Sequence, residues 1–132
     1  MIVSAPLLRM RLLALLKQIA LILMIIAIGT VFDWFVHGFS PRFAVPEYYF
    51  PHKIVYGTVI GVIALWVYRC LIPSDRWLAF AVTLTVAILI QVRYYLQGYD
   101  LTFVLLFAGV HFVVWFIPAV FLFPAFRKTI RA

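Results

Sequence analysis

The sequence predicts an all-α integral membrane bundle of four antiparallel transmembrane helices, and its composition and patterning carry this prediction. Hydrophobic residues make up 67% of the 132 residues and charged residues only 11%. A soluble domain usually holds about 45–50% apolar and about 25% charged residues. The apolar residues gather in four stretches with short breaks between them, too short for a soluble domain. We therefore expect one transmembrane domain that covers residues 1–132.

Each predicted span contains the roughly 20 mostly apolar residues that a transmembrane helix needs. The first begins with basic residues and contains Ala27, Ile28 and Gly29, which resemble a leader cleavage site, but we expect it to remain as a true span. Short breaks make successive helices antiparallel neighbours. The predicted spans are residues 12–36, 54–72, 77–96 and 101–123.

The placement of Lys and Arg predicts the orientation, because these residues are enriched in cytoplasmic segments. With the N-terminus inside, the outer side keeps only Arg42, Lys53 and Arg93 of the eleven basic residues. Both termini are therefore expected in the cytoplasm, and the plasma membrane of a prokaryote is the expected location. The basic residues that account for the net charge of +7 lie singly or in small groups at the ends of apolar stretches, unlike the clustered basic face of nucleic-acid binders. We expect lipid contact and no nucleic-acid partner.

Small residues in two spans indicate close helix packing, since small side chains let helix backbones approach in lipid. Gly57 and Gly61 form a G-x-x-x-G pattern, and Ala79, Thr83 and Ala87 form a stripe in the third span. These residues suit packing within the chain or against a partner chain, and packing within the chain is the simpler interpretation.

Candidate metal ligands gather near the predicted outer boundary. Asp33 and His37 are four residues apart, which places them on one helix face, and Glu47 and His52 lie across the next break. Imidazole and carboxylate groups together suit a transition metal such as Zn, Cu or Fe. The alternative is that all four are ordinary interfacial residues that cap helix ends and contact lipid headgroups. Asp33 could also pair with Arg93 of the third span, which would lower the cost of both charges.

Other polar residues are expected inside the spans. Gln91 and Arg93 lie in the outer part of the third span. His111 is ten residues into the fourth span, about 15 Å along a helix, so we expect it to lie too deep for His37 or His52. A structural hydrogen bond or an intersubunit contact is then more plausible for His111 than haem ligation. Cys70, the only cysteine, excludes an internal disulfide and is expected to be a small apolar residue near a helix end.

No complete catalytic set is visible: the chain has no H-E-x-x-H, no Gly-rich phosphate loop and no serine within a span that could act as a nucleophile. The sequence therefore favours a role other than that of an enzyme. It favours a small accessory or assembly subunit of a larger membrane complex. The alternative is a small membrane metal-binding protein or metalloenzyme that uses the Asp33, His37, Glu47 and His52 cluster, and a third possibility is a homo-oligomeric channel or transporter.

Overall fold

The computed structural model describes residues 5–132. Within these residues the chain is helical without any strand, which confirms the predicted all-α fold class. Four long helices are accompanied by two short ones. In chain order they are α1 (Ala5–Gly38), the 3-10 helix η1 (Pro41–Phe43), α2 (Tyr49–Tyr68), α3 (Asp75–Leu96), α4 (Leu101–Ala125) and α5 (Arg127–Ile130).

The four long helices are each long and apolar enough to cross a membrane, which fits a multi-pass integral membrane protein. Three of them begin earlier than the hydropathy pattern suggests: α1 at Ala5 instead of residue 12, α2 at Tyr49 instead of residue 54, and α3 at Asp75 instead of residue 77. The second helix also ends earlier, at Tyr68 instead of residue 72. Charged residues such as Arg9, Arg11 and Lys53 end an apolar stretch, but they do not break a helix, because the hydrogen bonds of a helix lie within its own backbone.

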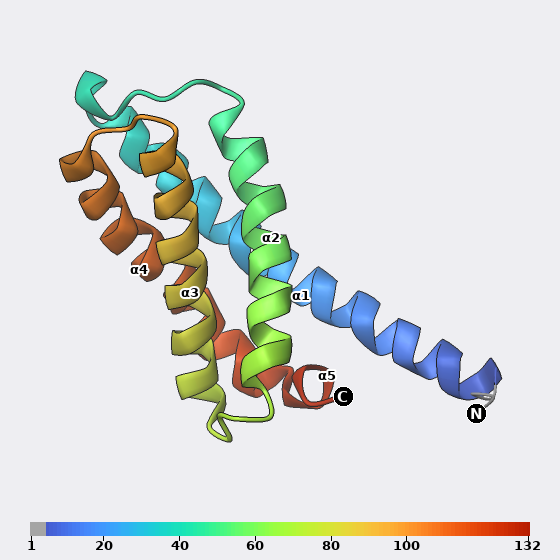
Figure 1. The fold of residues 1–132 in the computed structure, drawn as a ribbon. Helices are drawn as coiled ribbons and strands as arrows, with labels where there is room; N and C mark the ends of the chain where they lie inside the picture. The colour runs from blue at the N-terminus through green and yellow to red at the C-terminus, as the bar shows by residue number, and fades with distance from the viewer. Residues whose placement is uncertain (1–4) are drawn as a thin grey trace.

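The long helices form a closed ring of neighbours, because α1 and α3 each pack against both α2 and α4. Figure 1 shows α2 leading away from the end of the bundle where α1 finishes, α3 returning, and α4 leading away again. The first part of α1 leaves the bundle and extends well past the other helices. We call this part, residues 5–13, the α1 arm; every one of its residues is exposed.

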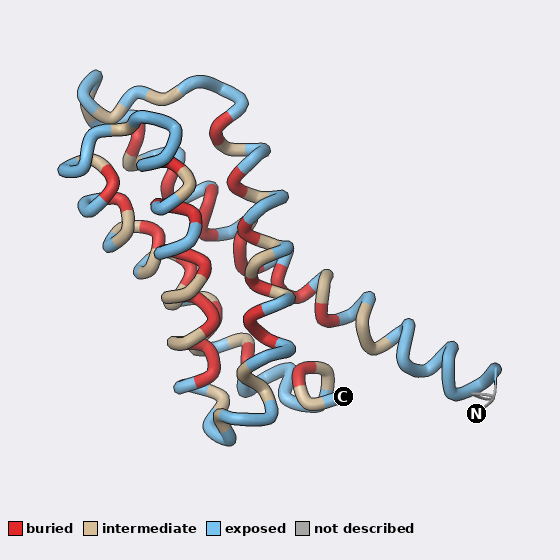
Figure 2. The backbone as a smooth tube through the Cα atoms, viewed as in Figure 1, coloured by how far each residue is buried: buried red, intermediate tan, exposed pale blue. Residues whose placement is uncertain are grey.

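The core lies along the inward faces of the four helices, as the buried stripe in Figure 2 shows. Gly57 and Gly61 of α2 face α1, where an added Cβ would lie 3.2 Å and 2.7 Å from the Cγ2 atoms of Ile26 and Ile22. The α3 stripe of Ala79, Thr83 and Ala87 is also buried within the chain. The small residues thus bring helices of this chain together.

At the end of the bundle where α2 ends and α3 begins, the last residues of the chain hold the helices together. The Arg131 guanidinium donates to the backbone oxygens of Arg69, Ile72 and Pro73, and it pairs with Asp75 at 2.9 Å. These contacts fix the end of α2 and the start of α3 to the C-terminal segment. Each hydrogen bond to a charged group contributes about 1.5–3 kcal/mol, so Arg131 stabilises this end strongly.

Candidate functional site

Five polar side chains, contributed by all four long helices, meet inside the bundle. Asp33 and His37 come from α1, Lys53 from the first turns of α2, Gln91 from α3 and His111 from α4, and each is at most 5% exposed. We call these five residues the polar cluster. Ionisable groups inside a membrane bundle are costly and mark functional sites by default, so the interactions within the cluster decide what it can do.

Asp33 and Lys53 form the charged centre of the cluster. The Lys53 ammonium donates to Oδ2 of Asp33, and both side chains are completely buried. A buried pair of opposite charges is tolerated only when its remaining donors and acceptors are also satisfied. The second partner of Lys53 is Nε2 of His111, at 2.7 Å.

The contact with Lys53 defines the tautomer of His111. An ammonium only donates, so with Lys53 charged Nε2 of His111 accepts from it and the imidazole proton lies on Nδ1; Nε2 also lies 3.0 Å from Oδ1 of Asp33. Nδ1 lies 2.7 Å from the amide nitrogen Nε2 of Gln91, while the amide oxygen Oε1 is buried without a partner. With the amide oxygen turned toward Nδ1, both atoms are satisfied, and Gln91 holds the Nε2 lone pair of His111 toward Asp33 and Lys53.

His37 is oriented in the same way from the other side. Its Nδ1 contacts the backbone oxygen of Phe43, and because a carbonyl only accepts, Nδ1 carries the proton. Nε2 of His37 then points at the Asp33 carboxylate, 3.5 Å from Oδ2. His37 Nε2 is buried without a hydrogen-bond partner. Oδ1 of Asp33 lies 3.0 Å from Nε2 of His111, which has no proton to donate to it when it accepts from Lys53. Two acceptor groups therefore face each other inside the protein, an arrangement that favours a cation between them.

Aromatic rings hold these groups in place. The His37 ring lies parallel to the Phe107 ring, with centroids 4.2 Å apart, and the Tyr49 and Phe50 rings meet it edge-on. Lys53 Nζ lies 4.0 Å from the centroid of the Tyr49 ring, within the range of a cation–π interaction. The packing leaves the imidazole and the ammonium little freedom to rotate.

A second aromatic layer lies over the cluster where α3 connects to α4. Tyr94 stacks on Tyr49 at 4.5 Å, and Tyr99 of the connection stacks on Phe103 at 5.3 Å. Burial raises the pKa of the Tyr99 hydroxyl, and the neighbouring Tyr48 acts in the same direction. Tyr99 is therefore a neutral phenol at physiological pH and brings no charge close to the cluster.

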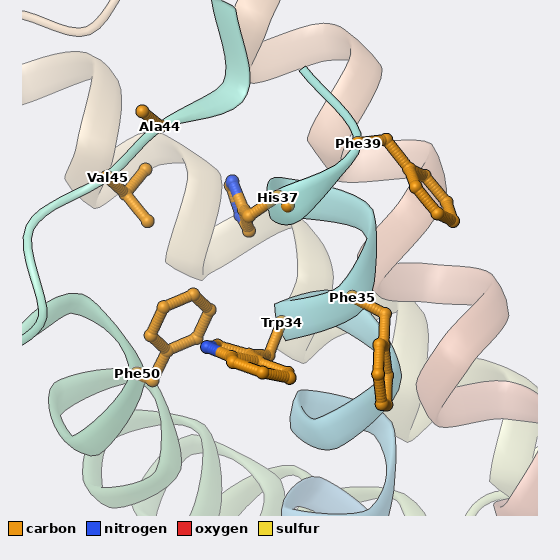
Figure 3. A pocket seen from close by; sticks show the side chains of 8 residues that line it. Trp34, Phe35, His37, Phe39, Ala44, Val45 and Phe50 are labelled. Carbon is orange, nitrogen blue, oxygen red and sulfur yellow. The ribbon is translucent and has the colours of Figure 1, made fainter. Parts of the chain in front are cut away.

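His37 is the cluster residue next to the surface. Figure 3 shows its imidazole projecting from α1 toward the Ala44–Val45 segment, above Trp34 and Phe50. A hollow of about 410 Å³ opens there. His37 is the cluster residue that lines this hollow, and the Asp33 carboxylate is buried 3.5 Å from its Nε2.

Toward the other end of the bundle the cluster is closed by apolar packing. The His111 ring stacks on the Trp115 ring with centroids 5.0 Å apart. Beyond Trp115 the buried side chains of the described residues are mainly aliphatic, among them Ile22, Ile26 and Ala119. The cluster is thus open toward one end of the bundle only.

Asp33, His37 and His111 have the geometry of three ligands of one metal ion. One ligand atom from each lies within 4.8 Å of the others, and the Asp33 oxygens lie 3.5 Å from His37 Nε2 and 3.0 Å from His111 Nε2. Atoms bound at about 2.1 Å to a tetrahedral zinc ion lie about 3.4 Å from one another. Metal-bound histidines usually direct their other ring N–H to an oxygen acceptor, as His37 does with the Phe43 carbonyl.

Of the four metal ligands proposed from the sequence, only Asp33 and His37 join this group. Glu47 and His52 are exposed; Glu47 lies beside a separate hollow between α1 and α2, and His52 packs against Tyr48. His52 and Lys53 are neighbours in α2, so their side chains point in different directions around the helix. Only Lys53 faces the interior.

The prediction that His111 lies too deep in the membrane to approach His37 was wrong. The two imidazoles belong to one group of candidate ligands. The possible pair of Asp33 with Arg93 is not formed either. Asp33 pairs with Lys53, and the half-buried Arg93 lies over the Tyr56 ring at 4.1 Å. The tilt of α1 and the inward direction of Lys53 bring the cluster together, and the hydropathy pattern predicts neither of them.

Lys53, His111 and Gln91 were thus missed as members of a common site. A signal was present, because a lysine and a histidine close to apolar stretches require partners, but sequence spacing does not identify a partner on another helix. No family model matches the chain, and no curated protein or solved structure is detectably similar to it. The assignment of function therefore depends on the site itself.

Proposed function

We propose that this protein is a small membrane metal-binding protein that holds a transition-metal ion between Asp33, His37 and His111. One observation carries the proposal: one ligand atom from each of Asp33, His37 and His111 lies within 4.8 Å of the others, and Nε2 of His37 is a buried acceptor without a partner. A zinc, copper or iron ion satisfies two imidazoles and a carboxylate at once. The ligand set differs from the sequence-based one because His111 replaces Glu47 and His52.

In this proposal the charge on Lys53 decides whether the site can bind a metal ion. Its ammonium is the positive charge that now balances Asp33. A divalent ion beside both Asp33 and a charged Lys53 would leave two uncompensated positive charges in a low-dielectric interior, which is strongly unfavourable. Metal binding therefore requires that Lys53 loses its proton or moves away. A neutral Lys53 amine would be a further nitrogen donor close to the ion.

The test is the metal content of the purified protein. The chain is produced in detergent with zinc, copper or iron supplied, and bound metal is measured by elemental analysis after gel filtration. We expect about one ion per chain, lost in His37→Ala and in His111→Ala. Cobalt substitution provides a second measurement, because tetrahedral Co²⁺ with nitrogen and oxygen ligands absorbs visible light in a characteristic band.

His52 supplies a matched control. His52→Ala removes an exposed imidazole one residue from Lys53, and Glu47→Gln removes an exposed carboxylate. Both variants should keep the metal. The proposal is wrong if folded wild-type protein binds none of the three metals, or if His52→Ala loses the metal while His111→Ala retains it.

An accessory-subunit role is the second candidate, supported by the α1 arm. Every residue of the arm is exposed, and Met10 and Leu13 are among its exposed apolar side chains. In this proposal the arm contacts a helix of another membrane chain. A photoreactive residue at Leu13 should then give one discrete protein adduct in native membranes, whereas Phe121 of α4 should give lipid adducts only. Lipid adducts at both positions would contradict the subunit role.

The channel or transporter is supported least. Its path would have to pass the apolar packing beyond Trp115 in each chain, or run between several copies of the chain. The expected location in a prokaryotic plasma membrane with cytoplasmic termini stays part of the proposal, and it depends on the asymmetric placement of the basic residues.

A further inference from the structure

We infer that the basic end of the bundle carries a binding groove for one anionic phospholipid, between the α1 arm and the end of α2. This inference is independent of the metal proposal, because it concerns the opposite end of the bundle and different residues. It is argued from the shape of the groove, its charges and its interfacial tryptophan.

The groove has the form of a lipid site. It encloses about 550 Å³, and its apolar wall is formed by Leu8, Leu12 and Leu15 of α1 together with Trp66 of α2. In a membrane such a wall accepts an acyl chain. The arm provides this wall because α1 diverges from the second half of α2 as it leaves the bundle (Figure 1).

Two arginines provide the anion-binding part. Arg11 and Arg69 both line the groove, and among the described residues neither forms an ion pair with a carboxylate side chain. One nitrogen of the Arg69 guanidinium, Nη1, donates to the oxygen of Ala132, which also lines the groove, at 2.7 Å. The guanidinium lies 5.7 Å from the Trp66 ring. Guanidinium groups bind phosphate in a two-pronged geometry, so two of them beside an apolar wall match a phosphodiester with attached chains.

Trp66 fixes the depth of the groove. Its indole N–H donates to Oε1 of Gln18 at 2.9 Å, and Gln18 donates in turn to the backbone oxygen of Thr129. Tryptophan prefers the interface between headgroups and chains. These hydrogen bonds tie α1, α2 and the C-terminal segment together at that level, so the groove is a formed feature of the fold.

The surrounding charge selects an anionic lipid over a zwitterionic one. Asp75, the acidic residue at this end, is already paired with Arg131 at 2.9 Å and Arg127 at 3.5 Å. Each Lys or Arg near an anionic surface strengthens lipid binding. The basic residues at this end are Arg9, Arg11, Lys17, Arg69, Arg76, Arg127, Lys128 and Arg131.

The experiment uses the full chain in detergent, titrated with phosphatidylglycerol or phosphatidylcholine and examined by native mass spectrometry. We expect one phosphatidylglycerol molecule to bind about 30-fold more tightly than phosphatidylcholine, the effect expected of two well-placed arginines. Arg11→Gln with Arg69→Gln should abolish this preference. If the double variant does not fold, Arg11→Gln alone serves, because no hydrogen bond or ion pair of its side chain is found among the described residues.

The matched control, Arg9→Gln with Arg76→Gln, removes two charges from the same end but none from the groove. It should retain the preference. Equal losses in both double variants would show general surface attraction and overturn the inference, as would equal binding of the two lipids by the wild type. Displacement of phosphatidylglycerol by millimolar inorganic phosphate would indicate a free-phosphate site and would also overturn it.

Discussion

Nε2 of His37 faces Oδ2 of Asp33 at 3.5 Å across one turn of α1, and in the neutral imidazole no proton lies between them. Nδ1 of His37 holds its proton because it contacts the Phe43 carbonyl. Buried polar atoms almost always have partners, so a pair of facing acceptors is a feature that favours a cation. Lys53 provides one for Asp33 and His111, but not for His37.

The first prediction concerns Lys53→Met, which removes the competing ammonium and keeps the apolar stem. Without metal the variant leaves Asp33 charged and unpaired, and we expect a loss of about 3–5 kcal/mol in the free energy of unfolding. With zinc at 100 times its dissociation constant, binding should restore about 2.7 kcal/mol. Thermal unfolding in detergent, with EDTA or with zinc, measures both effects.

Lys17→Met is the control for this experiment, because Lys17 is exposed on α1 and should change neither stability nor zinc response. A Lys53→Met variant that melts at the same temperature with zinc and with EDTA would speak against a metal between Asp33, His37 and His111. The wild type should respond to zinc less than the variant does, because its ammonium competes with the ion.

The second prediction concerns Gln91→Leu, which removes the partner of His111 Nδ1 without touching a proposed ligand. Residues that orient a metal-bound histidine typically contribute 10–100-fold to metal affinity, and we expect a loss of about that size. The unpaired Nδ1–H should also lower stability by about 1–3 kcal/mol. Competition with a zinc chelator measures affinity. Gln97→Leu, at an exposed helix end, should leave affinity unchanged.

The helices could be predicted from the sequence because hydropathy reports directly on lipid contact. All four long helices follow from the apolar stretches. The polar cluster could be predicted only as far as Asp33 and His37, since a spacing of four residues on one helix is a local property. In the linear sequence Lys53 stands at the edge of an apolar stretch, as a residue at the membrane boundary would. Its partner His111 is 58 residues away. Such contacts depend on helix tilt and rotation, which are set by packing between helices.

The third prediction concerns the crossing of α1 and α4. A Cβ on Gly29 would lie 2.2 Å from Cδ1 of Trp115 and 2.7 Å from the backbone oxygen of Val114. Backbone cannot move aside as a flexible side chain does, so Gly29→Ala should force the helices apart. We expect a loss of about 1–3 kcal/mol from overpacking, together with a weaker contact between Trp115 and His111.

Gly109→Ala is the matched control on α4, because nothing lies within 4 Å of its added Cβ. It should be neutral or stabilising by up to about 1 kcal/mol, the helix-propensity difference between the two residues. Chemical unfolding of both variants in the same detergent gives the comparison. Equal stability of Gly29→Ala and Gly109→Ala would contradict the close approach of α1 to Trp115.

The fourth prediction concerns orientation, and Cys70 is its natural reporter because it is the only cysteine in the chain and is exposed. It follows α2 at the end of the bundle where most basic residues lie. If basic residues lie in the cytoplasm, a membrane-impermeant maleimide should label Cys70 only after intact cells are opened. A Cys70→Ser chain that carries Gln97→Cys, in the exposed connection between α3 and α4, should be labelled before opening. The reverse pattern would place both ends of the chain outside, and the hollow beside His37 would then take its metal from the cytoplasm.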